Sequence, residues 1–304
     1  MISPGAPFAG HRYVSDVLEG LLDAAETRRA VRAYCVRLLD SLDAPLRAQL
    51  ESSATYVGGK CMGYPAIWFL ERLLAQDGIS VESILERCSV TLCISLTTSI
   101  VDDLADGDEP FGSAYLAYLY VLIAKAALDG HAADPDARNR LYHALDVCLN
   151  PGASTASDVI ERRGKRIGAF FQMIAGDVLG ELWTPERTNV ALGVIGRFGE
   201  ICAHIDDWMD AERDLARGIS DNTTLVLLSG RLGAAPAAKD LALHREWLRD
   251  ELVGILTRHI TKMAAALRPL KVPAAIRGLD VLLLRLPPTL DATEFRPRTL
   301  LRPV

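Results

Sequence analysis

The sequence predicts an all-α protein that forms one domain. Apolar residues recur at three- and four-residue intervals in nearly every segment between turn signals, which is the period of an amphipathic helix. The chain shows no series of alternating strands joined by hairpin turns. Its 304 residues suffice for one large core, and no Pro/Gly/Ser-rich linker divides them, so we expect a single domain over 1–304.

Ten helices are expected along the chain, separated by turn chemistry. They cover residues 15–50, 62–76, 79–106, 111–130, 135–149, 155–181, 186–214, 221–231, 236–267 and 272–286. The breaks fall at Gly58-Gly59, Gly107 to Pro110, Asp134-Pro135, Asn150-Pro151-Gly152, Thr184-Pro185 and Gly218. Periodicity is lost after Leu286, so residues 286–304 are expected to form a surface tail.

Composition excludes several classes of function. A net charge of -6 argues against nucleic acid as a partner, because such proteins present a basic face to phosphates. The six cysteines are scattered and no signal peptide opens the chain, so a cytoplasmic location is expected. The uncharged apolar runs at 89–101 and 111–124 are too short to span a bilayer, and we expect them to be buried helices of a soluble protein.

The most informative feature is an acidic motif that occurs twice. SIVDDLADGDEP and AHIDDWMDAERD each place two adjacent aspartates and a third one helical turn later, after an isoleucine and an apolar approach. The six carboxylates belong to Asp102, Asp103, Asp106, Asp206, Asp207 and Asp210. A solvated acidic helix end is the alternative for one such motif, but two matching copies favour a functional site. Converging carboxylates repel one another unless cations lie between them, so the pattern predicts divalent metal binding.

The type of metal follows from the donors. Carboxylates without a nearby histidine or cysteine cluster suit magnesium, or manganese, rather than zinc. Magnesium usually shares its coordination shell with substrate phosphate oxygens, which predicts an enzyme that acts on a phosphate or diphosphate ester. Neither GxxxxGK[ST] nor GxGxxG occurs in the chain.

Four segments carry a resemblance to the trans-isoprenyl diphosphate synthase family. They are YVGGK at 56–60, DDLADG at 102–107, GKRIGAFFQMIAGD at 164–177 and DDWMDAERDLARGISDNTTLVLL at 206–228. The resemblance extends over roughly 50 to 232. It implies a helical bundle around a central cavity, in which two Asp-rich motifs on facing helices hold three magnesium ions around an allylic isoprenyl diphosphate.

The resemblance also implies roles for individual residues. Asp102, Asp106 and Asp206 are the implied direct metal ligands, while Asp103, Asp207 and Asp210 ligate or support them. Arg166 aligns with the diphosphate-binding lysine of the family, and Lys165 is the alternative. Phe170 lies one turn after Arg166 and either faces the carbocation pocket or packs in the core. His204 either contacts diphosphate or packs, and Trp208 is expected in the core.

The chain departs from the family where a second diphosphate would bind. In GGKCMGYP, Lys60 is kept, but Cys61 and Gly63 stand where arginines are expected, and no arginine follows the first Asp motif. Each lost cation removes charge-assisted bonds of about 1.5–3 kcal/mol to an anion. Tyr56 and Tyr64 flank this segment and would fill the vacated space. The pattern indicates one diphosphate substrate rather than two.

Several functions are compatible with this pattern. The favoured one is a terpene synthase, which ionises an allylic diphosphate and lets the cation cyclise. Prenyl transfer to a neutral acceptor such as an indole is second, and a chain elongase with an acceptor site rebuilt from Arg162, Arg163 or Arg213 is third. A non-catalytic regulatory subunit is a further alternative, although such subunits usually lose the Asp motifs that this chain keeps.

Two further expectations rest on the resemblance. Residues at the fourth and fifth positions before the first Asp motif limit chain length in the family, and here they are Thr98 and Thr97. These small residues favour a substrate of C20 or longer. Family members commonly pair, so a homodimer is expected, with 111–124 as a candidate interface or an ordinary buried helix.

Overall fold

A computed structural model describes residues 14–60, 63–106, 112–130 and 156–292. In this part of the chain every regular element is a helix, which confirms the all-α prediction. The first half comprises α1 (Val14–Leu22), α2 (Ala25–Arg37), α3 (Ala44–Lys60), α4 (Gly63–Leu73), α5 (Val81–Arg87), α6 (Ser89–Asp106) and α7 (Ser113–Gly130). The second half comprises α9 (Ala156–Leu182), α10 (Pro185–Arg217), α11 (Thr223–Leu232), α12 (Ala238–Leu243), α13 (Arg245–Leu267), η1 (Arg268–Leu270) and α14 (Pro273–Asp291).

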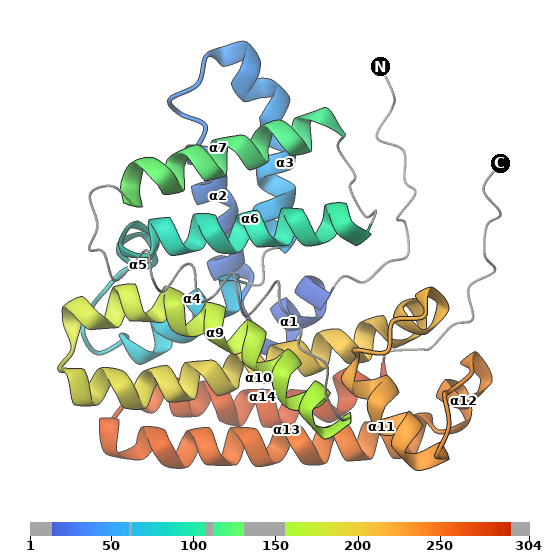
Figure 1. The fold of residues 1–304 in the computed structure, drawn as a ribbon. Helices are drawn as coiled ribbons and strands as arrows, with labels where there is room; N and C mark the ends of the chain where they lie inside the picture. The colour runs from blue at the N-terminus through green and yellow to red at the C-terminus, as the bar shows by residue number, and fades with distance from the viewer. Residues whose placement is uncertain (1–13, 61–62, 107–111, 131–155, 293–304) are drawn as a thin grey trace.

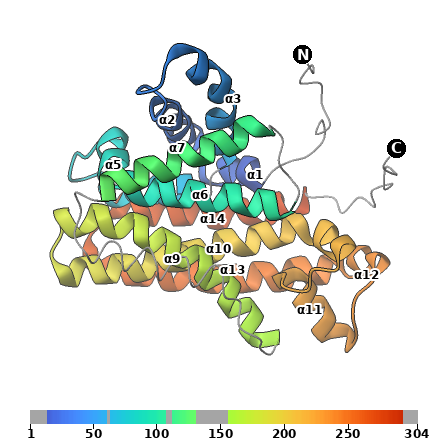
Figure 2. The same ribbon diagram turned by 45° about the horizontal axis from the view of Figure 1, so that its top comes forward.

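The antiparallel pair α9–α10 forms the middle of the molecule. Helices α6 and α7 lie side by side above this pair in both views (Figure 1 and Figure 2). Helix α13 packs against α10, and α14 packs against α13, α1 and α4. Stacked aromatic rings join α4 to α10, with 4.8 Å between the ring centroids of Phe69 and Phe198. Each such pair contributes about 0.5–1.5 kcal/mol beyond area burial.

Glycines set the close approach of α9 to α10. A Cβ on Gly168 would lie 2.6 Å from the carbonyl oxygen of Gly196, and one on Gly199 would lie 2.7 Å from the Cα of Gly168. Both distances are well inside van der Waals contact, so only glycine permits this spacing. The GKRIGAFF segment therefore has a packing role as well as the binding role implied for its basic residues.

Substituting Gly168 tests this packing. We expect Gly168→Ala to lower the free energy of unfolding by roughly 1–3 kcal/mol, because the added methyl group meets backbone that cannot move aside without separating the two helices. Gly193→Ala is the matched control on α10, since nothing lies within 4 Å of a Cβ there. It should leave stability unchanged or raise it by about 0.5–1 kcal/mol. Urea unfolding measures both, and equal effects would contradict the packing role.

Several predicted boundaries were wrong. The helix predicted over 15–50 is divided between α1, α2 and the start of α3, with a break at Asp23, which has φ 55°. The helix predicted over 79–106 is divided into α5 and α6, which meet at an angle of 80°. The helix predicted over 236–267 is divided into α12 and α13. The breaks at Asp23, Cys88 and His244 lack the Gly and Pro residues on which the prediction depended, whereas Pro45 stands in the first turn of α3.

Two predicted stops were also wrong. Gly58 and Gly59 lie inside α3. They allow α3 to pack closely on α2, because a Cβ on either would lie within 3.0 Å of Cys35 or Arg32. The tail predicted from 286 was wrong for residues 286–291, since α14 continues through Asp291 and Leu290 is buried. Arg245 of α13 stabilises this last turn by donating to the carbonyl oxygens of Leu290 (3.3 Å) and Asp291 (2.6 Å). The helix predicted over 135–149 and residues 293–304 lie outside the described residues.

The two apolar runs differ in their burial. Helix α6 buries Leu92, Leu96 and Ile100, whereas α7 buries Tyr118 but exposes Tyr120 by 71%. The prediction that 111–124 is simply buried is therefore wrong for one face of α7. Across the described residues, no single helix is long and apolar enough to cross a bilayer, and only α5 with α6, across their bend, reaches the required length and composition.

Candidate functional site

The second Asp motif lies in the last third of α10. Asp206 and Asp210 are half-buried one turn apart, whereas Asp207 and Trp208 have no exposed surface. Trp208 is a core residue, as predicted. The three aspartates therefore differ in accessibility: Asp206 and Asp210 can be reached by a ligand, and Asp207 points into the protein.

Asp207 connects α10 to the start of α11. Its Oδ2 accepts a hydrogen bond from the backbone N–H of Thr223 (2.8 Å). The side-chain amide of Asn222 donates to the Asp207 carbonyl oxygen and to Oδ2 of the buried Asp214, both at 2.8 Å. Oδ1 of Asn222 caps α11 by accepting from the N–H groups of Thr224 and Leu225. Of the two roles predicted for Asp207, these contacts favour support.

Asn222 therefore holds the second motif in place, and its removal should be costly. We expect Asn222→Ala to lower the free energy of unfolding by about 2–4 kcal/mol, combining the lost helix cap with a buried Asp214 carboxylate that loses a donor. Asn189→Ala, at an exposed position earlier on α10, is the matched control and should change stability by less than about 0.5 kcal/mol. Chemical unfolding distinguishes the two, and a small effect at Asn222 would show that the cap is dispensable.

His204 lies on the same side of α10 as these contacts. It is 3% exposed, and its Nδ1 lies 3.0 Å from the hydroxyl of Thr223. Its ring stands edge-on to His259 of α13, whose Nδ1 is 3.2 Å from a carboxylate oxygen of Glu200. Of the two roles considered for His204, the packed one is therefore supported: the histidine fixes Thr223 from a second direction.

Asp210 has a basic neighbour on its own helix. Nη2 of Arg213 donates to Oδ2 of Asp210 at 2.6 Å, and Nε of Arg213 lies 3.9 Å from Oδ1 of Asp214. In the chain-elongase alternative, Arg213 would help to bind the acceptor substrate, and these contacts compete with that role. An Arg213 that pairs with both aspartates orients the motif from the solvent side.

The first motif ends α6. Asp102, Asp103 and Asp106 occupy its last two turns, and Arg166 lies in the first half of α9, but their side chains are not among those the structure describes. Lys165, the alternative to Arg166, is exposed. The ends of α6 and α10 that carry the two motifs point toward the same side in Figure 1, and α9 packs against both helices.

The donors of the second motif fit a hard divalent cation. Asp206 and Asp210 offer carboxylate oxygens one turn apart, half-buried, with a third carboxylate held rigidly beside them. Oxygen donors of this kind suit magnesium. Among the described side chains, no three His, Cys, Asp or Glu residues converge closely enough to hold a metal ion by themselves. A metal site at the second motif would need further ligands.

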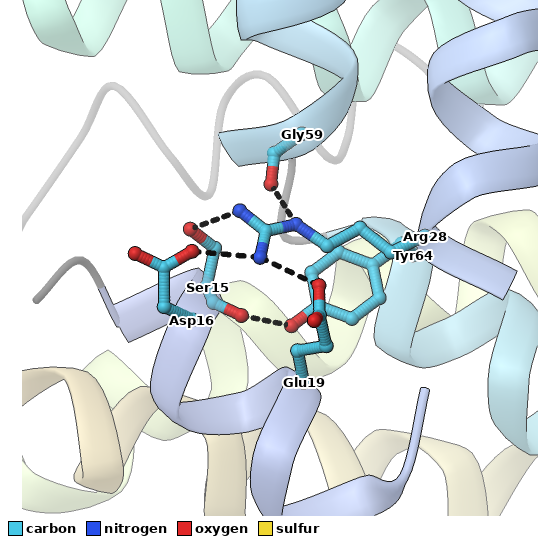
Figure 3. A network of polar contacts seen from close by, with 6 residues as sticks. All are labelled: Ser15, Asp16, Glu19, Arg28, Gly59 and Tyr64. Atoms are coloured by element: carbon cyan, nitrogen blue, oxygen red, sulfur yellow. Dashed lines mark hydrogen bonds and ion pairs between the residues drawn. The ribbon is translucent and has the colours of Figure 1, made fainter. Parts of the chain in front are cut away.

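The GGK segment lies against two arginines of α2. Arg28 donates from Nε to the carbonyl oxygen of Gly59 (2.6 Å) and from Nη1 to Asp16 and Glu19 (2.7 and 2.8 Å), as Figure 3 shows. Its Nη2 donates to the hydroxyl of Ser15 (3.1 Å). Burial opposes its charge, but the hydrogen bonds to the two carboxylates outweigh that effect and raise its pKa.

Arg32, one turn further along α2, lies directly against Gly59. A Cβ on Gly59 would be 2.2 Å from Nε of Arg32, so the glycine makes room for this guanidinium. Burial, followed by repulsion from Arg28, lowers the pKa of Arg32. Its Nε is buried and has no hydrogen-bond partner among the described residues.

Both arginines line a cleft between α1, α2 and α3. Its volume is about 600 Å³, and its lining also includes Lys60, Tyr56 and Glu51. Nζ of Lys60 lies 6.0 Å from the centre of the Tyr56 ring. Tyr64 was predicted to fill this space, but it does not line the cleft. It is fully buried, and its hydroxyl donates to the carbonyl oxygen of Ser15 (2.6 Å). The cleft therefore combines three cations with the carboxylates of Asp16 and Glu51.

Thr98 and Phe170 lie on facing helices. Thr98 is half-buried on α6, and its hydroxyl is hydrogen-bonded to the carbonyl oxygens of Ile94 and Ser95 of its own helix. Phe170 packs with Ile94 of α6 and Met173 of α9 in a small cluster that is separate from the main core. Phe171, in contrast, belongs to the main core. The two adjacent phenylalanines thus lie in different surroundings.

Sequence reasoning missed Arg28, Arg32 and Asn222. Arg28 and Arg32 belong to an ordinary helical segment far from the GGK motif in the chain, and nothing local distinguishes them from surface arginines. Asn222 had a detectable signal, since an asparagine before Thr223-Thr224 and an apolar run is a typical N-cap. Comparison of the chain with protein-family models, curated proteins and solved structures gave no match in any of the three.

Proposed function

We propose that this protein is a magnesium-dependent class I terpene synthase built like a trans-isoprenyl diphosphate synthase. It would ionise one allylic isoprenyl diphosphate and let the carbocation cyclise. The observation that carries the proposal is the doubled acidic motif, placed on α6 and α10 with α9 packed against both helices. A regulatory subunit has no need of two intact copies.

The residues of the proposed site would have separate roles. Asp102, Asp106 and Asp206 would hold the magnesium ions, with Asp103, Asp207 and Asp210 ligating or supporting them. Bound magnesium would supply Lewis-acid stabilisation of the departing diphosphate. Arg166, or Lys165, would add positive charge from α9, and no protein nucleophile is required. Asn222 and Asp207 would keep the second motif fixed relative to α11. Phe170 would present an aromatic face to the cation.

The test is release of pyrophosphate without a second diphosphate. Purified protein with magnesium and allylic diphosphates of C10, C15, C20 or C25 should release pyrophosphate and a hydrocarbon or alcohol, identified by mass spectrometry. EDTA should abolish release and added magnesium should restore it, because the carboxylates bind the substrate through the metal. No release with any of these substrates would contradict the proposal.

A second candidate is transfer of the allylic group to an anionic acceptor such as isopentenyl diphosphate. The observation that favours it is the cleft beside Gly59, where Arg32 of α2 adds a cation next to Lys60, the one cation that the altered GGK motif keeps. Arg28 contributes less, because Asp16 and Glu19 already pair with it. Turnover that depends strictly on isopentenyl diphosphate, and that Arg32→Met weakens, would favour this candidate. Turnover that requires a neutral aromatic acceptor would favour the indole-type prenyltransferase instead.

The resemblance also supports a homodimer. Leu116, Tyr120 and Ile123 follow one another at helical spacing on α7 and are each more than 40% exposed. This face is the candidate interface. Sedimentation velocity tests it, and a monomer at micromolar concentration would contradict it.

A further inference from the structure

Thr223 joins α11 to the second Asp motif through two separate contacts. It is the first residue of α11 and has no exposed surface. Its backbone N–H donates to Oδ2 of Asp207 at 2.8 Å, and its hydroxyl lies 3.0 Å from Nδ1 of His204. His204 and Asp207 are one turn apart on α10, and Asp206 lies between them in the chain. A single residue of α11 therefore holds α10 on both sides of Asp206.

The next residue of α11 shows that the hydroxyl contact is specific to position 223. Thr224 is also buried, at 1% exposed, but its hydroxyl oxygen has no hydrogen-bond partner within the described part of the chain. The two threonines have the same shape and nearly the same burial, so the contact with His204 is what distinguishes their hydroxyl groups. Position 224 is therefore a matched control for position 223.

His204 is itself fixed by α13, which packs against both α10 and α11. Its ring stands edge-on to the ring of His259, with 6.1 Å between the centroids and 86° between the planes. Nδ1 of His259 lies 3.2 Å from a carboxylate oxygen of Glu200, one turn before His204 on α10. His204 is 3% exposed, and a buried ring with neighbours on two sides is restricted to one orientation. Helix α13 thus holds the imidazole beside the Thr223 hydroxyl.

Both contacts of Thr223 act on the stretch of α10 that carries Asp206. Asp207 is fully buried and Asp206, the residue before it, is half-buried, so a shift of Asp207 also redirects the Asp206 carboxylate. Magnesium tolerates only small departures from octahedral geometry. Removing a residue that orients a metal ligand therefore typically weakens metal binding by about 10–100-fold.

We infer that Thr223 and His204 are positioning residues for a divalent cation at the second Asp motif. The Thr223 hydroxyl, held by His204, fixes the backbone N–H that anchors Asp207, and the anchored Asp207 sets the direction of Asp206. This inference rests on the proposed function, which assigns Asp206 to the metal. It requires the hydrogen bond between the two side chains and does not depend on a charge on the imidazole.

Binding of Mn²⁺ to the full chain, followed through the EPR signal of the free ion, tests the inference without turnover. The relevant binding is the part that Asp206→Ala removes. Thr223→Val keeps the shape of the side chain but loses the hydroxyl, and it should raise the Kd of this binding by about ten-fold. Thr223→Ser keeps the hydroxyl and should restore the Kd to within about two-fold of the wild-type value. Thr224→Val should also stay within about two-fold, because the hydroxyl that it removes makes no hydrogen bond to the described residues.

A double-mutant cycle tests whether the two residues act through one bond. His204→Leu should raise the Kd about as much as Thr223→Val, and the double variant should raise it no further, because both changes remove the same hydrogen bond. Additive effects would overturn the inference, since the two residues would then act separately. Should His204→Leu fail to fold, the three threonine variants decide the question by themselves.

The outcomes separate the inference from the function beneath it. If the wild-type protein shows no Mn²⁺ binding that Asp206→Ala removes, the proposed function fails and the inference falls with it. If that binding is present but Thr223→Val binds Mn²⁺ like the wild type, the metal site stands and the positioning role is wrong. The same holds if Thr224→Val weakens binding as much as Thr223→Val does.

Discussion

Asp206→Ala is expected to lower pyrophosphate release by about 10²–10³-fold, since removal of one electrostatic group that acts at the departing charge typically has an effect of this size. Asp206 is half-buried on α10, one turn before Asp210 and beside the buried Asp207. Its removal also relieves repulsion between neighbouring carboxylates, so the free energy of unfolding should be unchanged or slightly higher. Pyrophosphate release and urea unfolding, measured on the same preparation, separate the two effects.

Asp207→Asn provides a sharper contrast than alanine at that position. The asparagine oxygen can still accept from the backbone N–H of Thr223, so the contact between α10 and α11 should survive. If Asp207 acts mainly as a support, this variant keeps most of its turnover while Asp206→Asn loses it. Asp280→Ala, at an exposed position on α14, is the control for the loss of one acidic residue. Retention of turnover in Asp206→Ala would remove the case for a metal site at the second motif.

Helical periodicity predicted the fold class but not the helix ends. The period survives across Asp23 and across Cys88, because both sides of each break bury apolar faces, and neither break contains Gly or Pro. Conversely, Gly58 and Gly59 have the composition of a turn but lie in α3, where they accommodate Arg32 and Cys35. A glycine that serves close helix packing and one that ends a helix look alike in sequence, and only the neighbouring helix distinguishes them.

The candidate site was predictable where its residues are local in the chain. The spacing of Asp206, Asp207 and Asp210 predicted a shared helix, and all three lie on α10. Their separate surroundings were not predictable, because they depend on Asn222 and Thr223, which approach from the next helix. The same applies to the altered GGK segment, since the cations nearest to it come from α2. Contacts of this kind depend on tertiary packing, which spacing does not encode.

The α2 arginines also carry the largest expected effect on stability. Arg28→Met should lower the free energy of unfolding by about 3–5 kcal/mol, the typical cost of removing one partner from a buried ion pair. The guanidinium of Arg28 joins three helices. It donates a hydrogen bond to the Gly59 carbonyl oxygen in the last turn of α3, and it forms ion pairs with Asp16 and Glu19 of α1. Asp16 and Glu19 are themselves 45% and 34% exposed, which places the expected loss toward the lower end of that range.

Three variants distinguish the Arg28 network from simple loss of charge. Arg29→Met, at the adjacent exposed position, should change stability by less than about 0.5 kcal/mol. Arg28→Lys keeps the charge but not the fork of donors, so it should recover only part of the loss. Adding Asp16→Asn to Arg28→Met should cost less than the sum of the single changes, because the carboxylate no longer lacks its partner. Additive effects in that cycle would show that Arg28 stabilises the fold through Gly59 and its aliphatic packing instead of through the ion pair.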